Sequence, residues 1–257
     1  MGTACVTGAA SGIGAATKSV LELAGHRVIG VDLHDADVVA DLSTPPGRVA
    51  AVDGVWSLCD GVLDVLVPCA GVGGLASSEL TVRLNYFGTM AVVEGLRGAL
   101  VTGTDSSVVM ISSNSTTMTP GLSPDDAQVY LAGDEEAAVA HFERAGWIAY
   151  PAGKLAIAYW VRSVAPTWIA DGIRVNAVAP GVIDTGMTRP LLDVPGINDA
   201  LASIPIPIGR WGRAEEIASI IAFLASPASS MIVGQVVFAD GGTDALLQPF
   251  AHPHPLA

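Results

Sequence analysis

Short apolar segments of β-type composition alternate with helix-type patterns along most of this chain, and this alternation restricts the fold more than any other feature. The apolar segments have no polar face. This is typical of strands in a parallel sheet that helices cover on both sides. The expected strands are Thr3–Thr7, Arg27–Val31, Val38–Ala40, Leu63–Val67, Ser107–Ser112, Arg174–Ala179 and Val233–Ala239.

Helix-type patterns fill most of the gaps between these strands. The expected helices are Gly12–Ala24, Pro46–Leu58, Ser78–Val101, Ala149–Asp171 and Ala214–Ala225. The alternation predicts an α/β fold: a Rossmann-type, doubly wound parallel sheet of about seven strands with helices on both faces. The chain has no internal repeat and no low-complexity linker, so we expect a single domain over residues 1–257.

Two segments depart from the simple alternation. Residues 114–148 form an insertion that begins with turn residues and continues with a helix-like stretch, Asp134–Ala145. Residues 186–213 hold four prolines and few charges. A long irregular stretch in a compact domain is often a binding loop, so we interpret residues 186–213 as a substrate lid.

Composition excludes several classes of protein. Apolar residues make up 51% of the chain, which is enough for a large core and excludes intrinsic disorder. Twelve basic and 25 acidic residues give a net charge of −13, so we expect neither nucleic-acid binding nor binding to anionic membranes. The three cysteines are odd in number and lie in apolar runs, which fits a reducing, cytoplasmic location without disulfides.

Targeting, membrane and metal signals are weak. The first residues lack a basic region and a long apolar run, so we expect no secretory signal. Residues 217–239 carry no charge, but Pro227 and Gly234 interrupt them, which predicts a buried helix, a turn and a strand; a membrane span is the alternative. His252 and His254 lie in a proline-rich tail without a third ligand, so we expect no metal.

A glycine-rich turn, Thr7–Gly14, joins the first strand to the first helix. Gly8 permits a tight turn, Gly12 leaves room for a pyrophosphate, and Gly14 permits close packing of helix on sheet. The helix N-terminus then presents free N–H groups to the phosphates. A turn without a ligand is the alternative. The dinucleotide contacts expected here are Gly8, Ser11, Gly12, Ile13 and Gly14.

A carboxylate, Asp32, follows the second strand, 18 residues after the last glycine of the turn. It can accept hydrogen bonds from both hydroxyls of an adenosine ribose and would repel a 2′-phosphate. Leu33 and His34 supply no cation for such a phosphate, so the sequence favours NAD over NADP; a turn cap is the alternative role of Asp32. Asp41 and Leu42, after the third strand, could frame the adenine.

Tyr150 and Lys154 are four residues apart at the start of an expected helix and therefore share one face. An ammonium group near a phenol favours the phenolate, so the pair could act as acid or base. Ser112 and Ser113 end a strand at the edge where such sheets bind ligands. One of the two hydroxyls could hold a substrate oxygen, and the other would only make hydrogen bonds within the turn. Tyr130 is the rival candidate, but the residue four positions after it is acidic (Asp134) rather than a lysine.

Along nearly its whole length the chain resembles the short-chain dehydrogenase/reductase family. The motifs that carry the resemblance are Thr7–Gly14, Asp32, Asp41-Leu42, Cys69-Ala70-Gly71, Asn85, Ser113, Tyr150–Lys154 and Pro180–Thr185. The family implies an oxidoreductase that uses a nicotinamide cofactor. Two departures stand out: Pro68-Cys69 replaces a polar pair, and the segment between Ser113 and Tyr150 is unusually long.

The resemblance also implies roles. Tyr150 would be the general acid/base, Ser113 would hold the substrate oxygen, and Lys154 would bind the nicotinamide ribose and lower the tyrosine pKa. Asn85 would anchor a water that relays protons through Lys154. The remaining cofactor contacts implied by the resemblance are Ala70, Gly71, Ile183 and Thr185.

The insertion and the N-terminal motifs are similar to those of the bacterial 3α-hydroxysteroid dehydrogenase/carbonyl reductases. This similarity, with the apolar lid, predicts a bulky apolar alcohol or ketone, a hydroxysteroid first. A reductase of small aliphatic or aromatic ketones and a non-catalytic NAD sensor or scaffold are the alternatives. The tryptophans 147, 160, 168 and 211 are interpreted as packing residues, Trp211 alternatively as a wall of the substrate site. Relatives assemble through two long helices; we expect a homodimer or homotetramer, with the insertion favouring the dimer.

Overall fold

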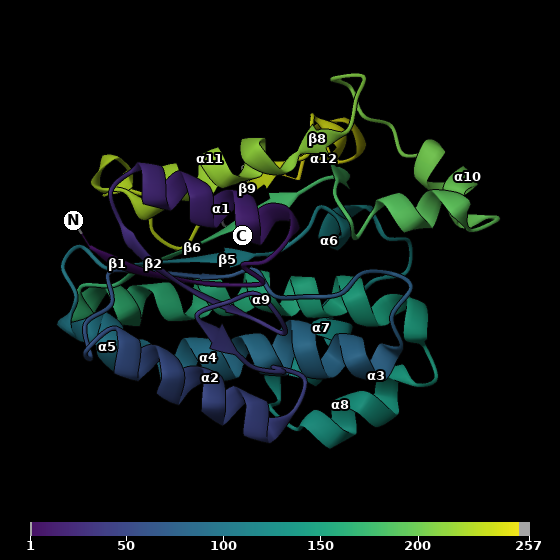
Figure 1. Cartoon of the computed structure of the whole chain (residues 1–257). Coiled ribbons are helices and arrows are strands. Elements are labelled where there is room, and N and C mark those ends of the chain that lie inside the picture. Colours follow the sequence, from purple (N-terminus) through teal and green to yellow (C-terminus); the bar gives the residue numbers. More distant parts are fainter. Residues whose placement is uncertain (1, 252–257) are drawn as a thin grey trace.

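Seven parallel strands form the central sheet of the computed structural model, which describes residues 2–251 (Figure 1). The strand order is β3-β2-β1-β4-β5-β6-β9. The order reverses between β1 and β4, and ligands of such sheets bind at the carboxyl ends of the strands near this point. The predicted fold class is confirmed. The strands are β1 (Thr3–Thr7), β2 (Arg27–Asp32), β3 (Val38–Val39), β4 (Val65–Pro68), β5 (Ser107–Ile111), β6 (Arg174–Pro180) and β9 (Val236–Ala239).

All seven predicted strands are present, and their ends differ by a few residues. β4 begins at Val65 rather than Leu63, because the Leu63 N–H donates to the carbonyl of Ala99 in a neighbouring helix. β9 begins at Val236 rather than Val233. Gly234 precedes it with a φ of +70°, which is incompatible with an extended strand.

Helices cover both faces of the sheet (Figure 1). On one face α1 packs against α11, over a core supplied mainly by alternate residues of the central strands. The other face carries the remaining long helices and the larger apolar cluster. The helices that cover the faces are α1 (Gly12–Leu23), α2 (Pro45–Leu58), α4 (Thr89–Gly95), α5 (Arg97–Thr102), α9 (Gly146–Trp168, extended by η2, Ile169–Asp171) and α11 (Ala214–Ala225).

The helix expected at 78–101 is not a single regular α-helix. It consists of α3 (Ser78–Thr81), a π-helical segment η1 (Val82–Gly88), α4 and α5. A Cβ on Gly88 would lie 2.5 Å from the carbonyl oxygen of Leu42, so this helix passes very close to the loop after β3. Such π segments often occur at functional sites, and this one contains Asn85.

The insertion at 114–148 holds three helices: α6 (Ser115–Met118), α7 (Pro124–Leu131) and α8 (Glu135–Phe142). The expected helix at 134–145 corresponds to α8, but α7 lies in a stretch interpreted as turn. Ser123 and Asp126 form a capping box at its start, and Ser, Pro and Asp occur in both turns and helix N-termini. Tyr130 of α7 stacks on Phe142 of α8, with ring centroids 4.9 Å apart.

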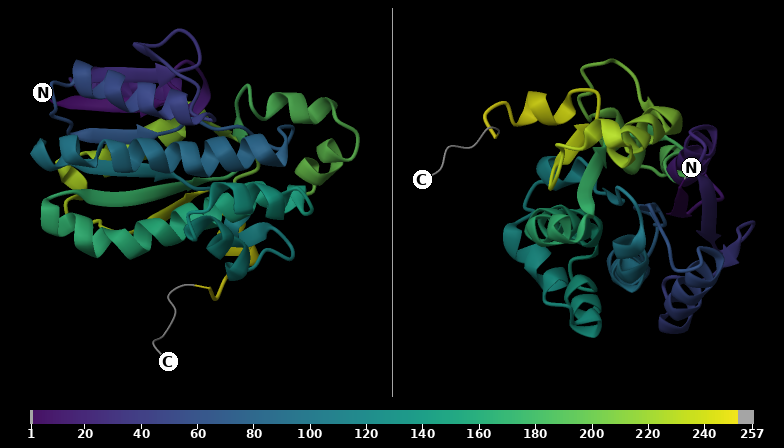
Figure 2. Two further views of the ribbon diagram at one scale, coloured as in Figure 1. Left: turned by 90° about the horizontal axis from the view of Figure 1, so that it is seen from below. Right: turned by 90° about the vertical axis from the view of Figure 1, so that its left-hand side faces the viewer.

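The segment at 186–213 contains η3 (Arg189–Asp193) and α10 (Ile197–Ala202), so it is less irregular than its prolines suggest. Two short strands, β7 (Ile183–Asp184) and β8 (Gly212–Arg213), pair in parallel and join its two ends. Figure 2 shows this segment extending beyond the end of the sheet. The pairing of β7 with β8 therefore fixes both ends of the segment. Its second half is held to the residues after β9: the Ile208 N–H donates to the Gly241 carbonyl oxygen, and the Thr243 hydroxyl donates to the Pro205 carbonyl oxygen.

Residues 217–239 form α11, a 3-10 turn η4 (Pro227–Ser229) and β9, as predicted, and α12 (Thr243–Leu247) follows. Within residues 2–251, no helix is long and apolar enough to cross a membrane. In the same range, no group of three or more His, Cys, Asp or Glu residues could hold a metal ion. His252 and His254 lie outside the described residues.

Candidate active site

A cavity of about 720 Å³ lies along the carboxyl ends of the strands. The turns after β1, β2, β4 and β5 form its inner wall, and α9, the loop after β6 and the lid form the rest. The cavity brings together all of the site residues expected from the sequence. These are Gly8, Ser11, Gly12, Ile13, Gly14, Asp32, Asp41, Leu42, Ala70, Gly71, Asn85, Ser113, Tyr150, Lys154, Ile183 and Thr185.

The glycine turn has the geometry of a phosphate cradle. A Cβ on Gly14 would lie 2.0 Å from the carbonyl oxygen of Gly8, so only glycine lets α1 approach the turn. Gly12 has a φ of +53°. A Cβ built on it would lie 3.7 Å from the side chain of Thr185, so the space above Gly12 is open. Ser11 at the N-cap makes no side-chain cap, and the first turn carries no acid. The free N–H groups of α1 therefore fit a pyrophosphate.

Asp32 has the structural role considered from the sequence as the alternative, that of holding a turn. One carboxylate oxygen accepts a hydrogen bond from the Ala10 N–H at 2.9 Å, and the other accepts from the Leu33 N–H at 2.7 Å. These bonds hold the end of β2 against the glycine turn. The half-buried carboxylate also lines the cavity. Its contact with an adenosine ribose stays a prediction.

We expect Asp32→Ala to weaken NAD binding about tenfold and to reduce the preference for NAD over NADP. The substitution removes the acceptor for the ribose hydroxyls and the repulsion of a 2′-phosphate. Initial rates with each cofactor at several concentrations would measure both effects. An unchanged ratio of the two kcat/KM values would mean that Asp32 only holds the turn.

Pro68 and Cys69 lack the polar side chains that the family often has here, but a hydrogen bond from a backbone N–H ties the end of β4 to β1 instead. The Ala70 N–H donates to the Thr7 hydroxyl oxygen at 3.0 Å, which joins the ends of β4 and β1. Cys69 lines the cavity, and burial raises the pKa of its thiol to about 12. The thiol is therefore protonated near neutral pH and is a poor nucleophile.

Lys154 lies almost completely inside the protein, below the carboxyl end of β5. Its Nζ donates to the Ile111 carbonyl oxygen at 2.8 Å and lies 5.7 Å from the centroid of the Tyr150 ring. Burial lowers the pKa of Lys154 to about 8. Ser112 donates its hydroxyl to the backbone carbonyl of Lys154 at 3.0 Å, so the first serine of the pair holds α9 in place.

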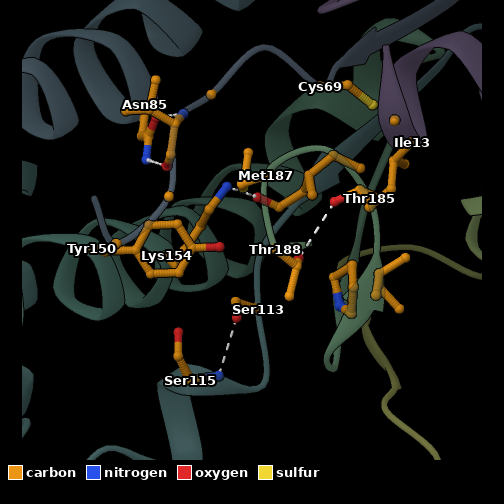
Figure 3. Close-up of a pocket in the computed structure, with 18 of the residues that line it drawn as sticks. Ile13, Cys69, Asn85, Ser113, Ser115, Tyr150, Lys154, Thr185, Met187 and Thr188 are labelled. Atoms are coloured by element: carbon orange, nitrogen blue, oxygen red, sulfur yellow. Dashed lines mark hydrogen bonds between the residues drawn. The ribbon is translucent and has the colours of Figure 1, made fainter. Parts of the chain in front are cut away.

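Tyr150, Lys154 and Ser113 face the same space, with Thr185 and Thr188 across from them (Figure 3). Ser113 Oγ accepts a hydrogen bond from the Ser115 N–H at 3.1 Å, which leaves its own proton to donate. Burial raises the pKa of Tyr150, and a hydrogen bond with Ser113 lowers it, with burial the larger effect. Burial thus dominates the pKa of this phenol in the fold. The lowering of the tyrosine pKa by Lys154 stays a prediction.

Asn85 uses its side chain to hold a loop. Its Oδ1 accepts from the Val72 N–H at 2.8 Å, and its Nδ2 donates to the Val72 carbonyl oxygen at 2.9 Å. These two bonds fix the loop that follows Gly71 beside the cavity. The proton relay through a water at Asn85 stays a prediction, and the amide is already engaged with the backbone.

The outer half of the cavity holds residues that the sequence interpretation missed. Trp147 was interpreted as packing, but it is 64% exposed and lines the cavity, whereas Trp160 and Trp168 are buried. Trp211, the alternative wall, does not line it. The sequence did hold a signal for this role: Trp147 stands one helical turn before Tyr150, which places its side chain near that of the candidate catalytic tyrosine. The other apolar residues here are Met118, Pro120, Met187, Leu191, Ile197, Ala200, Leu201 and Ile204.

Known proteins resemble this chain in sequence and in structure. The family described as "Enoyl-(Acyl carrier protein) reductase" matches residues 134–244. The 3-alpha-hydroxysteroid dehydrogenase/carbonyl reductase of Comamonas testosteroni is 39% identical over 249 residues, 95% of this chain and 97% of the relative. The cis-4-hydroxycyclohexanecarboxylate dehydrogenase of Sinomonas cyclohexanicum is 35% identical over 262 residues, 95% of this chain and 96% of the relative.

The crystal structure of the 3-alpha-hydroxysteroid dehydrogenase from Pseudomonas sp. B-0831, complexed with NADH, has a TM-score of 0.94 to this fold. Its sequence is 41% identical, and the match covers 97% of this chain and 99% of that one. These relatives are similar over nearly their whole lengths, and the glycine cradle fits a dinucleotide. The chain therefore belongs to the short-chain dehydrogenase/reductase family and is an NAD(H)-dependent oxidoreductase of alcohols and carbonyl compounds.

Proposed function

We propose that the protein interconverts a hydroxysteroid of the 3α-hydroxysteroid type, or a similarly bulky apolar secondary alcohol, and its ketone with NAD(H). The observation that carries this proposal is the apolar outer half of the cavity, which lies directly against Tyr150 and Ser113. Aromatic and thioether side chains such as Trp147 and Met187 suit a flat, rigid, apolar ligand. The similarity to two 3-alpha-hydroxysteroid dehydrogenases supports the same substrate class.

The charges around the cavity argue against an anionic substrate. Of the described residues that line it, Lys154 is the only cation, and its Nζ is engaged with a backbone carbonyl. Arg189 and Arg210, two cations of the lid itself, are paired with Asp184 and Glu216 at 2.7 Å each. A substrate carboxylate would therefore find no free partner among the cavity residues.

The chain's own residues can handle the proton of the reaction. Held by the glycine cradle, NAD would supply the hydride acceptor for oxidation of the carbon that bears the reacting oxygen, and NADH the hydride donor for reduction. Ser113 can donate its free proton to the substrate oxygen and so fix that oxygen beside the Tyr150 hydroxyl. Tyr150 then takes up the substrate proton in oxidation or supplies it in reduction. The charge on Lys154 stabilises the phenolate.

Initial rates of NADH formation with a panel of 3α-hydroxysteroids and simple secondary alcohols test the proposal. We expect 3α-hydroxysteroids to have the highest kcat/KM. Trp147→Ala should raise the steroid KM and leave the KM of a small alcohol nearly unchanged, because only the larger substrate reaches that wall. Turnover of small alcohols alone would overturn the steroid assignment while leaving the reaction class intact.

We expect oxidation to speed up with rising pH and reduction to be faster at neutral or lower pH. Because burial raises the pKa of Tyr150, its protonated form predominates at neutral pH, and that form supplies the proton for reduction. The phenolate needed for oxidation becomes populated as the pH rises. Profiles of kcat/KM for both directions would check this; an oxidation rate that levelled off below pH 7 would contradict it.

We also propose that the chain forms a homodimer. Helices α7 and α8 of the insertion pack against α9, η1 and α3, which belong to the two long helical segments through which the family resemblance implies assembly. The insertion would therefore obstruct one of the two contacts that a tetramer needs. Light scattering at several protein concentrations should give the mass of two chains, about 52 kDa from a chain of 26.1 kDa. A stable mass of four chains would rule the idea out.

A further inference from the structure

We infer that Glu135, on helix α8 of the insertion, is a positioning residue for the adenine end of the cofactor site. It acts through Arg48, which holds the loop that contains Asp41 and Leu42. The inference rests on the proposed placement of the adenine beside that loop. It gives the insertion a role in cofactor binding, in addition to the role in assembly proposed above.

Arg48 of α2 is the centre of the arrangement. Only 9% of its surface is exposed. Its Nε donates to the Leu42 carbonyl oxygen at 2.9 Å, and its Nη2 donates to the Ser43 carbonyl oxygen at 3.3 Å and to that of Arg83 at 2.8 Å. One guanidinium therefore joins the loop after β3 to helix η1, which carries the site residue Asn85.

Glu135 supplies the charge that makes this buried cation stable. Its two carboxylate oxygens lie 2.6 Å from Nη1 and Nη2 of Arg48, a bidentate pair, and Oε1 also accepts from Arg83 at 3.3 Å. The Glu135 side chain is 19% exposed. A buried guanidinium that loses its carboxylate keeps the desolvation cost without compensation, so it moves toward water. In doing so Arg48 would release the carbonyls of Leu42 and Ser43.

The loop that would loosen is part of the cavity. Asp41 and Leu42 line it, and the Leu42 carbonyl faces Gly88 so closely that a Cβ there would be 2.5 Å away. The loop is thus held between η1 and the Arg48 guanidinium. Tyr150 and Lys154 make no contact with this group of charges. Loss of Glu135 should therefore weaken the adenosine end of the site and spare the nicotinamide end.

Glu136 provides a matched control on the same helix. It also pairs with Arg83, at 2.7 Å, but it is 75% exposed and does not contact Arg48. Glu135→Gln and Glu136→Gln remove the same charge from adjacent positions and keep the shape of the side chain. A difference between the two variants therefore reports on Arg48 rather than on the net charge or on the attachment of α8 to Arg83.

Calorimetric titration of the full-length protein with AMP, NAD and nicotinamide mononucleotide tests the inference. For Glu135→Gln we expect the Kd of AMP and of NAD to rise by about 3- to 30-fold and that of nicotinamide mononucleotide to stay the same. With saturating NAD, kcat should be unchanged. Glu136→Gln should bind all three ligands as the unmodified protein does. Thermal unfolding would confirm that both variants are folded.

Four outcomes would overturn the inference. Equal weakening of AMP and nicotinamide mononucleotide would indicate general damage to the fold. Equal behaviour of the two glutamine variants would remove the special role of Arg48. Asp41→Ala, measured in parallel, tests the adenine placement itself: unchanged AMP binding in that variant would show that the adenine lies elsewhere. If Asp41→Ala weakens AMP and Glu135→Gln does not, only the coupling through Arg48 fails.

Discussion

Tyr150→Phe should lower kcat by about 10²- to 10⁴-fold and leave the Kd of NAD within about twofold of its normal value. The substitution removes one hydroxyl that lies beside Ser113 in the cavity, while the glycine cradle and Asp32 stay intact. The loss therefore falls on proton transfer rather than on binding. Rates with saturating substrate and a separate titration of NAD would distinguish the two effects.

Tyr130→Phe is the matched control for this prediction. The Tyr130 hydroxyl donates to the Ala149 carbonyl oxygen at 2.7 Å, and its ring is buried between α7 and α9. Its loss should cost about 1 kcal/mol of stability and leave most of the activity, because this hydroxyl does not reach the cavity. If Tyr130→Phe abolished turnover while Tyr150→Phe did not, the assignment of the acid/base would be reversed.

Lys154→Met should inactivate the enzyme and at the same time stabilise the fold at neutral pH. The pKa of Lys154 falls from 10.5 to about 8 because the folded chain buries its ammonium group. The unfolded state therefore binds the proton more tightly. This linkage destabilises the folded protein by about 3 kcal/mol below pH 8. Methionine has a similar volume and no charge, and the lost bond to Ile111 offsets about 1 kcal/mol of the gain.

The sign of this effect sets its pH range. The destabilisation is complete below about pH 8, shrinks as the pH rises toward 10.5, and vanishes when the lysine is neutral in both states. The difference in unfolding free energy between Lys154→Met and the unmodified protein should therefore be largest at pH 7 and close to zero or reversed near pH 11. Urea unfolding at both pH values would measure it. A variant less stable at pH 7 would show that the desolvation cost is small.

The sheet and the inner half of the site could be predicted from the sequence. Buried parallel strands have a distinctive apolar pattern. In the turn Thr7–Gly14, Gly8 and Gly14 occur where any side chain would clash with neighbouring backbone, so the spacing of the glycines indicates one particular kind of turn. Tyr150 and Lys154 were recognisable because a helix places residues four apart on one face. These features depend on local chain geometry, which a single sequence displays directly.

The outer half of the site depends on contacts between distant segments. Trp147 looked like a packing residue because its exposure is decided by where the lid lies relative to α9. The raised pKa of Tyr150 follows from burial in the finished fold, and no spacing in the sequence reports that burial. Arg48 and Glu135 are 87 residues apart in the chain, so the sequence alone does not indicate that they form an ion pair.

The pairing of β7 with β8 has a consequence for how this enzyme could change its substrate. Because Ile183 and Asp184 are in register with Gly212 and Arg213, the segment between the two strands starts and finishes at one fixed point. We therefore expect the length and side chains of its middle, which holds η3 and α10, to be exchangeable without movement of the dinucleotide cradle or the central sheet. Transplanting residues 186–211 between relatives should therefore transfer substrate range and leave the NAD affinity of the recipient unchanged.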